Sequence, residues 1–140
     1  MNNHLDKNTQ ILSDIKVLEI STGVSGAFAG RLLSIYGADV IVVEPPDGHQ
    51  TRYESVWDGD VNPENSTLFA YLGSGKRSIQ LDLHDESQIS YLKQLALSSN
   101  VVIENYPPGF LKDCGFDADE IANTDPQITI CHISSFGQTG

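Results

Sequence analysis

Three glycines, Gly23, Gly26 and Gly30, have types and spacing that suit ligand chemistry. Glycine lets the backbone approach a bound group closely, and the free N–H groups at the start of a helix attract a phosphate or a carboxylate. These glycines follow an apolar run and open a segment with helical periodicity. They therefore indicate an anion site at a strand-to-helix turn. The alternative is structural: Gly26 and Gly30 could serve only to let a helix pack closely on a strand.

The same turn invites comparison with a nicotinamide-dinucleotide site. Glu44 ends the next apolar run, where a ribose-binding acid would belong. The glycine spacing differs, because Val24 and Ser25 both stand between the first two glycines and the dinucleotide fingerprint has one residue there. The pattern therefore favours an anionic ligand without identifying NAD.

The other reactive side chains give no catalytic constellation. The four histidines are scattered without metal-ligand spacing, so we expect no metal site. His132 alternates with Cys131 and Ile133 in a predicted strand and is expected to be structural. Asp82 and Glu104 end predicted strands, where a hydrogen-bonded loop acid is commoner than a catalytic carboxylate. We therefore assign no catalytic residue.

Composition limits the classes of partner. The chain has 140 residues, 39% of them hydrophobic and 19% charged, which fits one domain with a buried core. A formal net charge of -11 disfavours nucleic acid and anionic lipid surfaces. No apolar run approaches the roughly 20 residues of a membrane helix, and the polar start lacks the features of a signal peptide. We expect a soluble cytoplasmic protein with a disordered tail over residues 1–13 and two reduced, buried cysteines, Cys114 and Cys131.

Alternating strand and helix signals predict an α/β fold. Apolar runs at 15–20, 39–44, 78–83, 100–104 and 128–133 predict five strands. Helices are expected at 26–36, with Phe28, Leu32, Leu33 and Ile35 as core positions, at 67–72, and after the capping residues Asp85 and Asp117. Short connections favour right-handed crossovers. The prediction is a Rossmann-like, open, mostly parallel sheet with helices on both faces, forming part of a domain.

Ligands of such sheets bind outside the carboxyl ends of the strands. The segments that leave those ends are rich in Gly, Pro, Ser and Asn, and they are residues 21–26, 45–52, 83–85, 105–109 and 134–140. Lys76 and Arg77 precede their strand, so they are expected at the opposite edge as a solvated or structural basic pair.

Four segments together resemble one protein family. They are Val-Leu-Glu-Ile at 17–20 running into Gly-Val-Ser-Gly at 23–26, Gly-Ala-Asp-Val-Ile-Val-Val-Glu-Pro at 37–45, Lys-Arg-Ser-Ile-Gln-Leu-Asp-Leu at 76–83, and Val-Val-Ile-Glu-Asn-Tyr-Pro-Pro-Gly at 101–109. In this order they resemble the N-terminal region of the class III coenzyme A transferases, which include formyl-CoA and carnitine-CoA transferases and the α-methylacyl-CoA racemases. The terminal Phe-Gly-Gln-Thr-Gly at 136–140 is similar as well.

The resemblance implies that residues 14–140 are the N-terminal part of such a domain, truncated before its catalytic residues. It implies a site for coenzyme A or acyl-CoA as substrate, without a metal, and an interlocked homodimer for the full-length protein. Three groups of residues would contact coenzyme A: Val24 and Ser25 at the first turn, Leu81, Asp82, Leu83 and His84 beside the adenine, and Asn105, Tyr106 and Pro107 at the pyrophosphate or pantetheine.

Two departures from the family pattern remove positive charge. Family members often have Arg where this chain has Pro45 and Asp113, and Arg52 and Lys112 are close enough in sequence to compensate. The expected function is that of a CoA-binding fragment of an enzyme that moves CoA between acyl-CoA and a carboxylic acid. A fragment of an α-methylacyl-CoA racemase and a non-catalytic nucleotide-binding module remain the alternatives.

Overall fold

A computed structural model describes residues 10–54 and 62–139. Five strands form one parallel sheet in the order β3-β2-β1-β4-β5. The strands are β1 (Lys16–Ile20), β2 (Asp39–Glu44), β3 (Arg77–Gln80), β4 (Val101–Glu104) and β5 (Thr129–His132). All five predicted strands are confirmed, although β3 is shorter than residues 78–83. The chain begins at β1 in the middle of the sheet and adds β2 and β3 on one side. It then crosses to the other side of β1 and adds β4 and β5.

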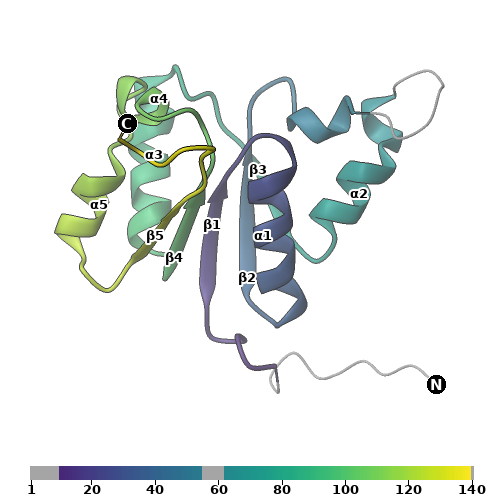
Figure 1. Cartoon of the computed structure of the whole chain (residues 1–140), viewed down its shortest axis with the longest axis horizontal. Coiled ribbons are helices and arrows are strands. Elements are labelled where there is room, and N and C mark those ends of the chain that lie inside the picture. Colours follow the sequence, from purple (N-terminus) through teal and green to yellow (C-terminus); the bar gives the residue numbers. More distant parts are fainter. Residues whose placement is uncertain (1–9, 55–61, 140) are drawn as a thin grey trace.

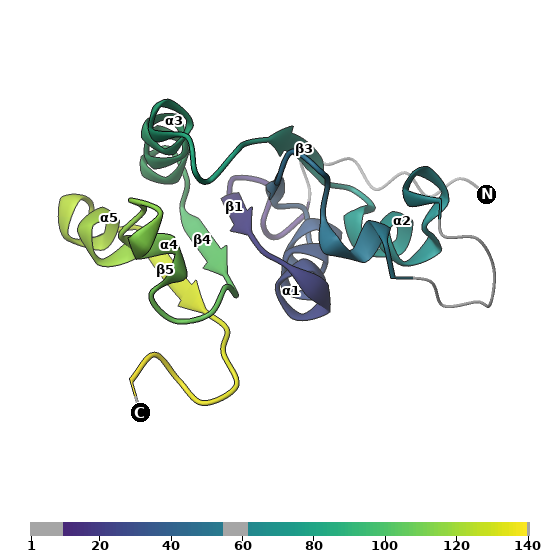
Figure 2. The ribbon, with the colours of Figure 1, turned by 90° about the horizontal axis from the view of Figure 1, so that it is seen from above.

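Helices cover both faces of this sheet, as predicted (Figures 1 and 2). They are α1 (Gly23–Ile35), α2 (Thr67–Gly73), α3 (Glu86–Leu97), α4 (Phe110–Asp113) and α5 (Ala118–Thr124), with 3-10 turns η2 (Gln50–Arg52) and η3 (Pro63–Asn65). Figure 2 shows α1 and α2 on one face and α3, α4 and α5 on the other. The main core lies under the second group, where Leu18, Val102, Leu92 and Phe116 are fully buried together.

Two helices begin where their capping residues predict. The Asp85 carboxylate accepts hydrogen bonds from the N–H groups of Ser87 and Gln88, and the Gln88 amide donates back to it. The Asp117 carboxylate accepts from the N–H of Asp119 at the start of α5. These local contacts satisfy the free N–H groups of the first turn, which is why both starts could be located from sequence.

The buried face of helix α1 differs from the predicted one. Phe28, Leu32 and Ile35 were expected to be buried, but they are 40%, 42% and 50% exposed. Only Leu33 of the predicted set packs towards the sheet, and the buried face is made of Gly26, Ala27 and Gly30. Val24, Phe28, Leu32 and Ile35 therefore form an apolar stripe on the outer side of α1, which we call the α1 stripe.

The α1 stripe predicts an observable property of the chain. An exposed, contiguous apolar patch binds hydrophobic dyes and promotes association. Replacing Phe28 and Leu32 together by glutamine is expected to reduce dye fluorescence and self-association in ultracentrifugation, with little change in unfolding. Replacing Tyr91, an exposed aromatic residue on α3, by glutamine is the matched control. Equal dye binding by the stripe variant and the wild type would contradict the prediction.

Two smaller expectations need correction. Residues 1–9 of the predicted tail lie outside the described residues, but residues 10–13 form a turn tied to the end of α1 by the Leu12 N–H and the Tyr36 carbonyl, 3.0 Å apart. Both cysteines are free, as expected, but Cys114 is half-buried and Cys131 is exposed. Cys131 lies on β5, at one edge of the sheet formed by the described residues.

Candidate functional site

An open cleft of about 990 Å³ lies at the carboxyl ends of β1, β4 and β5. It is bordered by the first turn of α1, the loop after β4 and the segment after β5. Its lining residues are Thr22, Ser25, Asn105, Tyr106, Pro107, Pro108, Ile133, Ser134, Ser135, Phe136, Gly137 and Gln138. The structure thus brings together four of the predicted site residues, Ser25, Asn105, Tyr106 and Pro107, at the edge chosen from topology.

The side chain of Asn105 joins two borders of the cleft. Its amide nitrogen donates to the Thr22 carbonyl at 2.6 Å and to the Ser25 hydroxyl at 2.9 Å, and its amide oxygen accepts from the Thr22 N–H at 2.7 Å. Both amide hydrogens are therefore used within the protein. Asn105 shapes the first turn of α1, and a direct contact with a ligand stays a prediction.

An aromatic contact links the loop after β4 to the loop after β3. Tyr106 stacks on Phe110, with ring centroids 4.9 Å apart, and the His84 ring meets Phe110 edge-on at 6.3 Å. Phe110 has no signal in the sequence beyond its place after Gly109. Of the second predicted group, His84 thus contacts Phe110 on α4, and none of residues 81–84 lines the cleft.

The remaining predicted site residues have other surroundings. Leu81 and Leu83 are buried in the main core, and Asp82 accepts a hydrogen bond from the His84 N–H at 2.9 Å. Asp82 is thus a hydrogen-bonded loop acid, the commoner of the two outcomes expected for it. Val24 belongs to the α1 stripe. None of these four side chains lines the cleft, and their predicted contact with coenzyme A is untested.

Beneath the first turn lies a buried network around Ser21 and His49. Burial lowers the pKa of His49, so its ring is neutral. Its Nδ1 lies 2.7 Å from the Thr51 hydroxyl and 3.2 Å from the Thr51 N, and its Nε2 lies 3.3 Å from the Ser21 hydroxyl. Ser21 then donates to Glu19 at 2.7 Å. The serine proton points to a carboxylate inside the protein, so Ser21 is structural.

Glu19 also forms a buried ion pair with Lys76. The Lys76 Nζ lies 2.6 Å from Glu19 Oε2 and 2.7 Å from the Ala27 carbonyl, and the two side chains are 2% and 0% exposed. Burial raises the pKa of Glu19 and lowers that of Lys76. Lys76 is therefore a structural residue before β3, one of the two roles expected for it.

The two inner glycines of α1 make room for this network. A Cβ at Gly30 would lie 1.9 Å from Glu19 Oε2, and one at Gly26 would lie 2.5 Å from the Ser21 Cβ. Gly26 and Gly30 thus allow close packing of α1 on the strand end, and a ligand at the same turn stays a prediction.

Glu44 holds Arg52 away from the cleft. Arg52 donates to both Glu44 oxygens, at 2.7 and 3.1 Å, and its guanidinium lies 3.6 Å above the Phe69 ring. Burial alone would raise the pKa of Glu44, but hydrogen bonds from Arg52, Ser78 and the His49 N–H outweigh it and lower the pKa to about 2. Arg52 is paired with Glu44 and does not line the cleft, so its expected replacement of a ligand-binding arginine stays a prediction.

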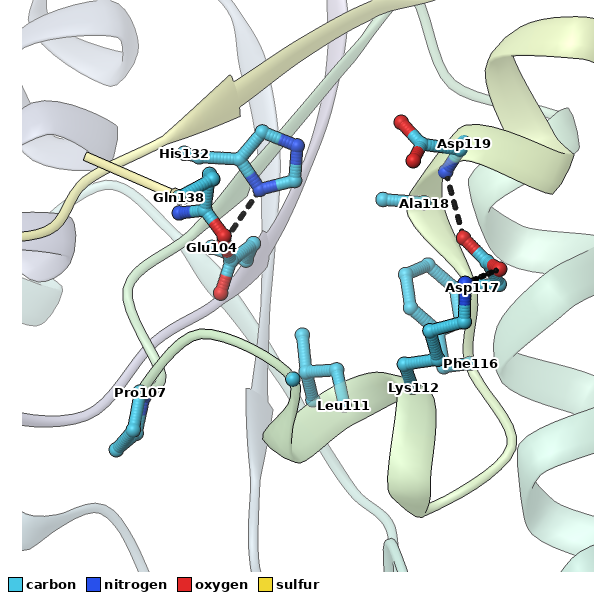
Figure 3. Close-up of a pocket in the computed structure, with 11 residues that line it drawn as sticks. Glu104, Pro107, Leu111, Lys112, Phe116, Asp117, Ala118, Asp119, His132 and Gln138 are labelled. Carbon is cyan, nitrogen blue, oxygen red and sulfur yellow. Dashed lines mark hydrogen bonds and ion pairs between the residues drawn. The ribbon is translucent and has the colours of Figure 1, made fainter. Parts of the chain in front are cut away.

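A second, smaller cavity of about 250 Å³ lies between β5, α4 and α5 (Figure 3). His132 Nδ1 and Glu104 Oε1 are 2.5 Å apart on one wall, and Lys112 and Asp117 form an ion pair of 2.8 Å on the other. His132 is thus partnered, in line with the structural role expected for it. This cavity shares Pro107 and Gln138 with the cleft.

The described residues contain neither a metal-binding cluster nor a membrane-spanning helix. No set of three or more His, Cys, Asp or Glu side chains within residues 10–54 and 62–139 is arranged to hold a metal ion. Among the helices described, none has the length and apolar character needed to cross a membrane.

The family model for CoA-transferase family III matches residues 12–140. The chain belongs to this family. Among curated relatives, the family member from Chloroflexus aurantiacus named succinyl-CoA--D-citramalate CoA-transferase is 33% identical, over 92% of this chain and 32% of its own. The human succinyl-CoA:glutarate CoA-transferase is 34% identical, over 95% of this chain and 30% of its own.

Solved structures support the same assignment. A CAIB/BAIF family protein from Brucella suis superposes with a TM-score of 0.84 and 36% identity, over 94% of this chain and 35% of its own. A hypothetical protein from Mycobacterium tuberculosis gives 0.82 and 29%, with the same two coverages. The chain thus has the family fold and spans about a third of the length of the curated relatives that it matches.

Proposed function

We propose that this chain supplies the acyl-CoA-binding region of an enzyme that transfers CoA between an acyl-CoA and a carboxylic acid. The observation that carries the proposal is the family match over residues 12–140 together with a cleft at the carboxyl edge of the sheet. The two curated relatives compared above are CoA-transferases by name. The cleft is open enough to admit an extended ligand, and its position follows the general rule for parallel sheets.

The N-terminus of α1 supports an anionic ligand in this cleft. Thr22 precedes the helix without capping it, because its hydroxyl donates to Gln50 Oε1 at 2.7 Å. No acidic residue lies in the first turn of α1. The first N–H groups of the helix, at the border of the cleft, therefore favour a phosphate or carboxylate.

Cations near the cleft are scarce. Arg52 is held by Glu44 and Lys76 by Glu19, so neither is free for a phosphate. Lys112 is 68% exposed beside the second cavity, although Asp117 pairs with it. Of the two compensating residues expected for Pro45 and Asp113, Lys112 is the one that keeps a solvent-accessible charge.

The further properties of the protein are part of the proposal. We place the region at residues 14–140, the catalytic groups outside it, the compartment in the cytoplasm, and the assembled state as an interlocked homodimer. A racemase of α-methylacyl-CoA and a binding module without chemistry remain alternatives. Product analysis of the full-length protein, which would include the catalytic groups, separates them: transfer to an added carboxylic acid, epimerisation of a 2-methylacyl-CoA, or neither.

Titration calorimetry of the protein with coenzyme A and with NAD tests the ligand. We expect saturable binding of coenzyme A and none of NAD, because the glycine turn lacks the dinucleotide spacing and its inner glycines pack on the sheet. Binding of NAD without any response to coenzyme A would refute the proposed function.

A further inference from the structure

The last residue of β4 connects two other segments at the carboxyl edge. Glu104 Oε1 lies 2.5 Å from His132 Nδ1 on β5, and Glu104 Oε2 accepts from the Tyr106 N–H at 3.0 Å. The Glu104 side chain is 7% exposed and that of His132 is 30% exposed. A carboxylate this deeply buried requires donors on both oxygens, and here β5 and the following loop provide them.

The next residue faces the opposite direction. Asn105, the first residue after β4, binds the first turn of α1, while Glu104 binds β5. Residues 104 and 105 thus fix the loop after β4 from both sides. Tyr106 and Pro107, which line the cleft, follow directly and take their positions from these two anchors.

We infer that His132, through Glu104, is a positioning residue for the ligand cleft. This inference rests on the proposed function, because it concerns how well the cleft binds coenzyme A. His132 acts at the cleft only through the loop: it borders the second cavity, and its ring edge carrying Nε2 points into that cavity (Figure 3). Its contribution is to hold the Glu104 carboxylate, and with it the Tyr106 N–H, in one place.

The imidazole suits this role because Nδ1 can carry a proton in both charge states of the ring. The hydrogen bond to Glu104 therefore persists when the ring is neutral, and the charged ring adds attraction. The charged groups that face the pair across the second cavity are Lys112 on α4 and Asp117 and Asp119 at the start of α5. Lys112 and Asp117 pair with each other, so His132 is the partner that the structure gives to Glu104.

Three variants on β5 test the inference by calorimetric titration of the protein with coenzyme A. His132→Leu keeps bulk but removes the donor, and we expect the dissociation constant to rise on the order of tenfold. His132→Asn places an amide N–H where Nδ1 lies, and we expect it to restore binding to within about threefold of wild type. Ile130→Ala removes packing from the same face of β5 while leaving the pair intact, so it is the control for destabilisation.

The outcomes separate the inference from the proposed function. A positioning role requires that His132→Leu binds coenzyme A more weakly than Ile130→Ala when both have similar melting temperatures, and that His132→Asn recovers. If the wild type binds coenzyme A and His132→Leu has the same dissociation constant, the inference is overturned but the proposed function is not. Equal weakening in His132→Leu and Ile130→Ala makes the role merely structural and also overturns it. A wild type that does not bind coenzyme A overturns the proposed function, and the inference with it.

Discussion

Replacing Lys76 by methionine is expected to lower the free energy of unfolding by about 3–5 kcal/mol, because it leaves Glu19 buried without its counter-ion. The two side chains are 2% and 0% exposed, so water cannot take over the lost contact. Urea denaturation of wild type and variant measures the difference. Lys93→Met is the matched control: Lys93 pairs with Glu120 at the surface, and its loss is expected to cost at most about 1 kcal/mol.

Acidification should narrow the gap between Lys76→Met and wild type. Burial already raises the pKa of Glu19, and removing the lysine removes the attraction that opposes this rise. An acid whose pKa is higher in the folded state does not lower the free energy of unfolding at a pH below its unfolded pKa, near 4.5. It lowers that free energy increasingly as the pH rises above this value. Because the pKa of Glu19 is already raised in the wild type, the variant should lose stability relative to wild type only once the pH rises above that raised, folded-state pKa. A gap that is constant with pH would argue against an uncompensated Glu19 charge.

The double variant Glu19→Met, Lys76→Met separates loss of the pair from loss of packing. Replacing both charges by apolar groups removes the buried carboxylate that makes the single change costly. We expect the double variant to be more stable than Lys76→Met at neutral pH. If the double variant were less stable than Lys76→Met, the stabilising role of Lys76 would lie in the polar network around Ser21 and not in neutralising the charge of Glu19.

The sheet was predictable because its signals are local. Each strand is a short apolar run between turn residues, and Asp85 and Asp117 mark helix starts through contacts with their own neighbours in sequence. Parallel pairing follows from the alternation of strands and helices. The position of the cleft then follows from topology alone, so Asn105 and Tyr106 could be placed at it before any geometry was known.

Hydrophobic periodicity mispredicted the orientation of α1, because Lys76, the partner of Glu19 57 residues away, is not part of that pattern. In the sequence, Glu19 is a single polar residue in an apolar strand. No residue near it indicates that it pairs with Lys76. Once that pair is buried under the helix, the residues above it must be small, and the bulky residues of α1 turn outward. A reading based on hydrophobic periodicity assigns the larger side chains to the core and so selects the wrong face.

The contacts of Arg52 were not predicted, for the same kind of reason. Its distance from Pro45 in sequence suggested a replacement for a ligand-binding arginine, but Glu44 at the end of β2 holds it with two hydrogen bonds. Phe110 likewise becomes meaningful only when the loops after β3 and β4 meet. Contacts between loops depend on the fold as a whole, so sequence gives the edge of the site and not its side-chain partners.

Replacing Gly30 by alanine is expected to destabilise the protein by about 3 kcal/mol or more, although alanine is the better helix former by about 1 kcal/mol. The new Cβ would lie 1.9 Å from Glu19 Oε2 and 2.9 Å from its Cδ. Glu19 cannot turn away, because Lys76 and Ser21 hold both of its oxygens and the side chain is buried. The helix must lift from the sheet or the ion pair must break, and urea denaturation measures the cost of either.

Gly73→Ala is the control that isolates this close contact. Gly73 ends α2, its φ is not positive, and the nearest atoms to an added Cβ are those of Phe69 at 3.8 Å, an ordinary contact. We expect that change to alter stability by no more than about 1 kcal/mol. In the background Glu19→Ala, Lys76→Met, which removes the obstructing carboxylate, Gly30→Ala should cost much less than in the wild type, because neighbouring residues couple. If Gly30→Ala melted at or above the wild-type temperature, α1 could not be packed on Glu19 as closely as the structure shows, and the reason given for its outward apolar stripe would be wrong.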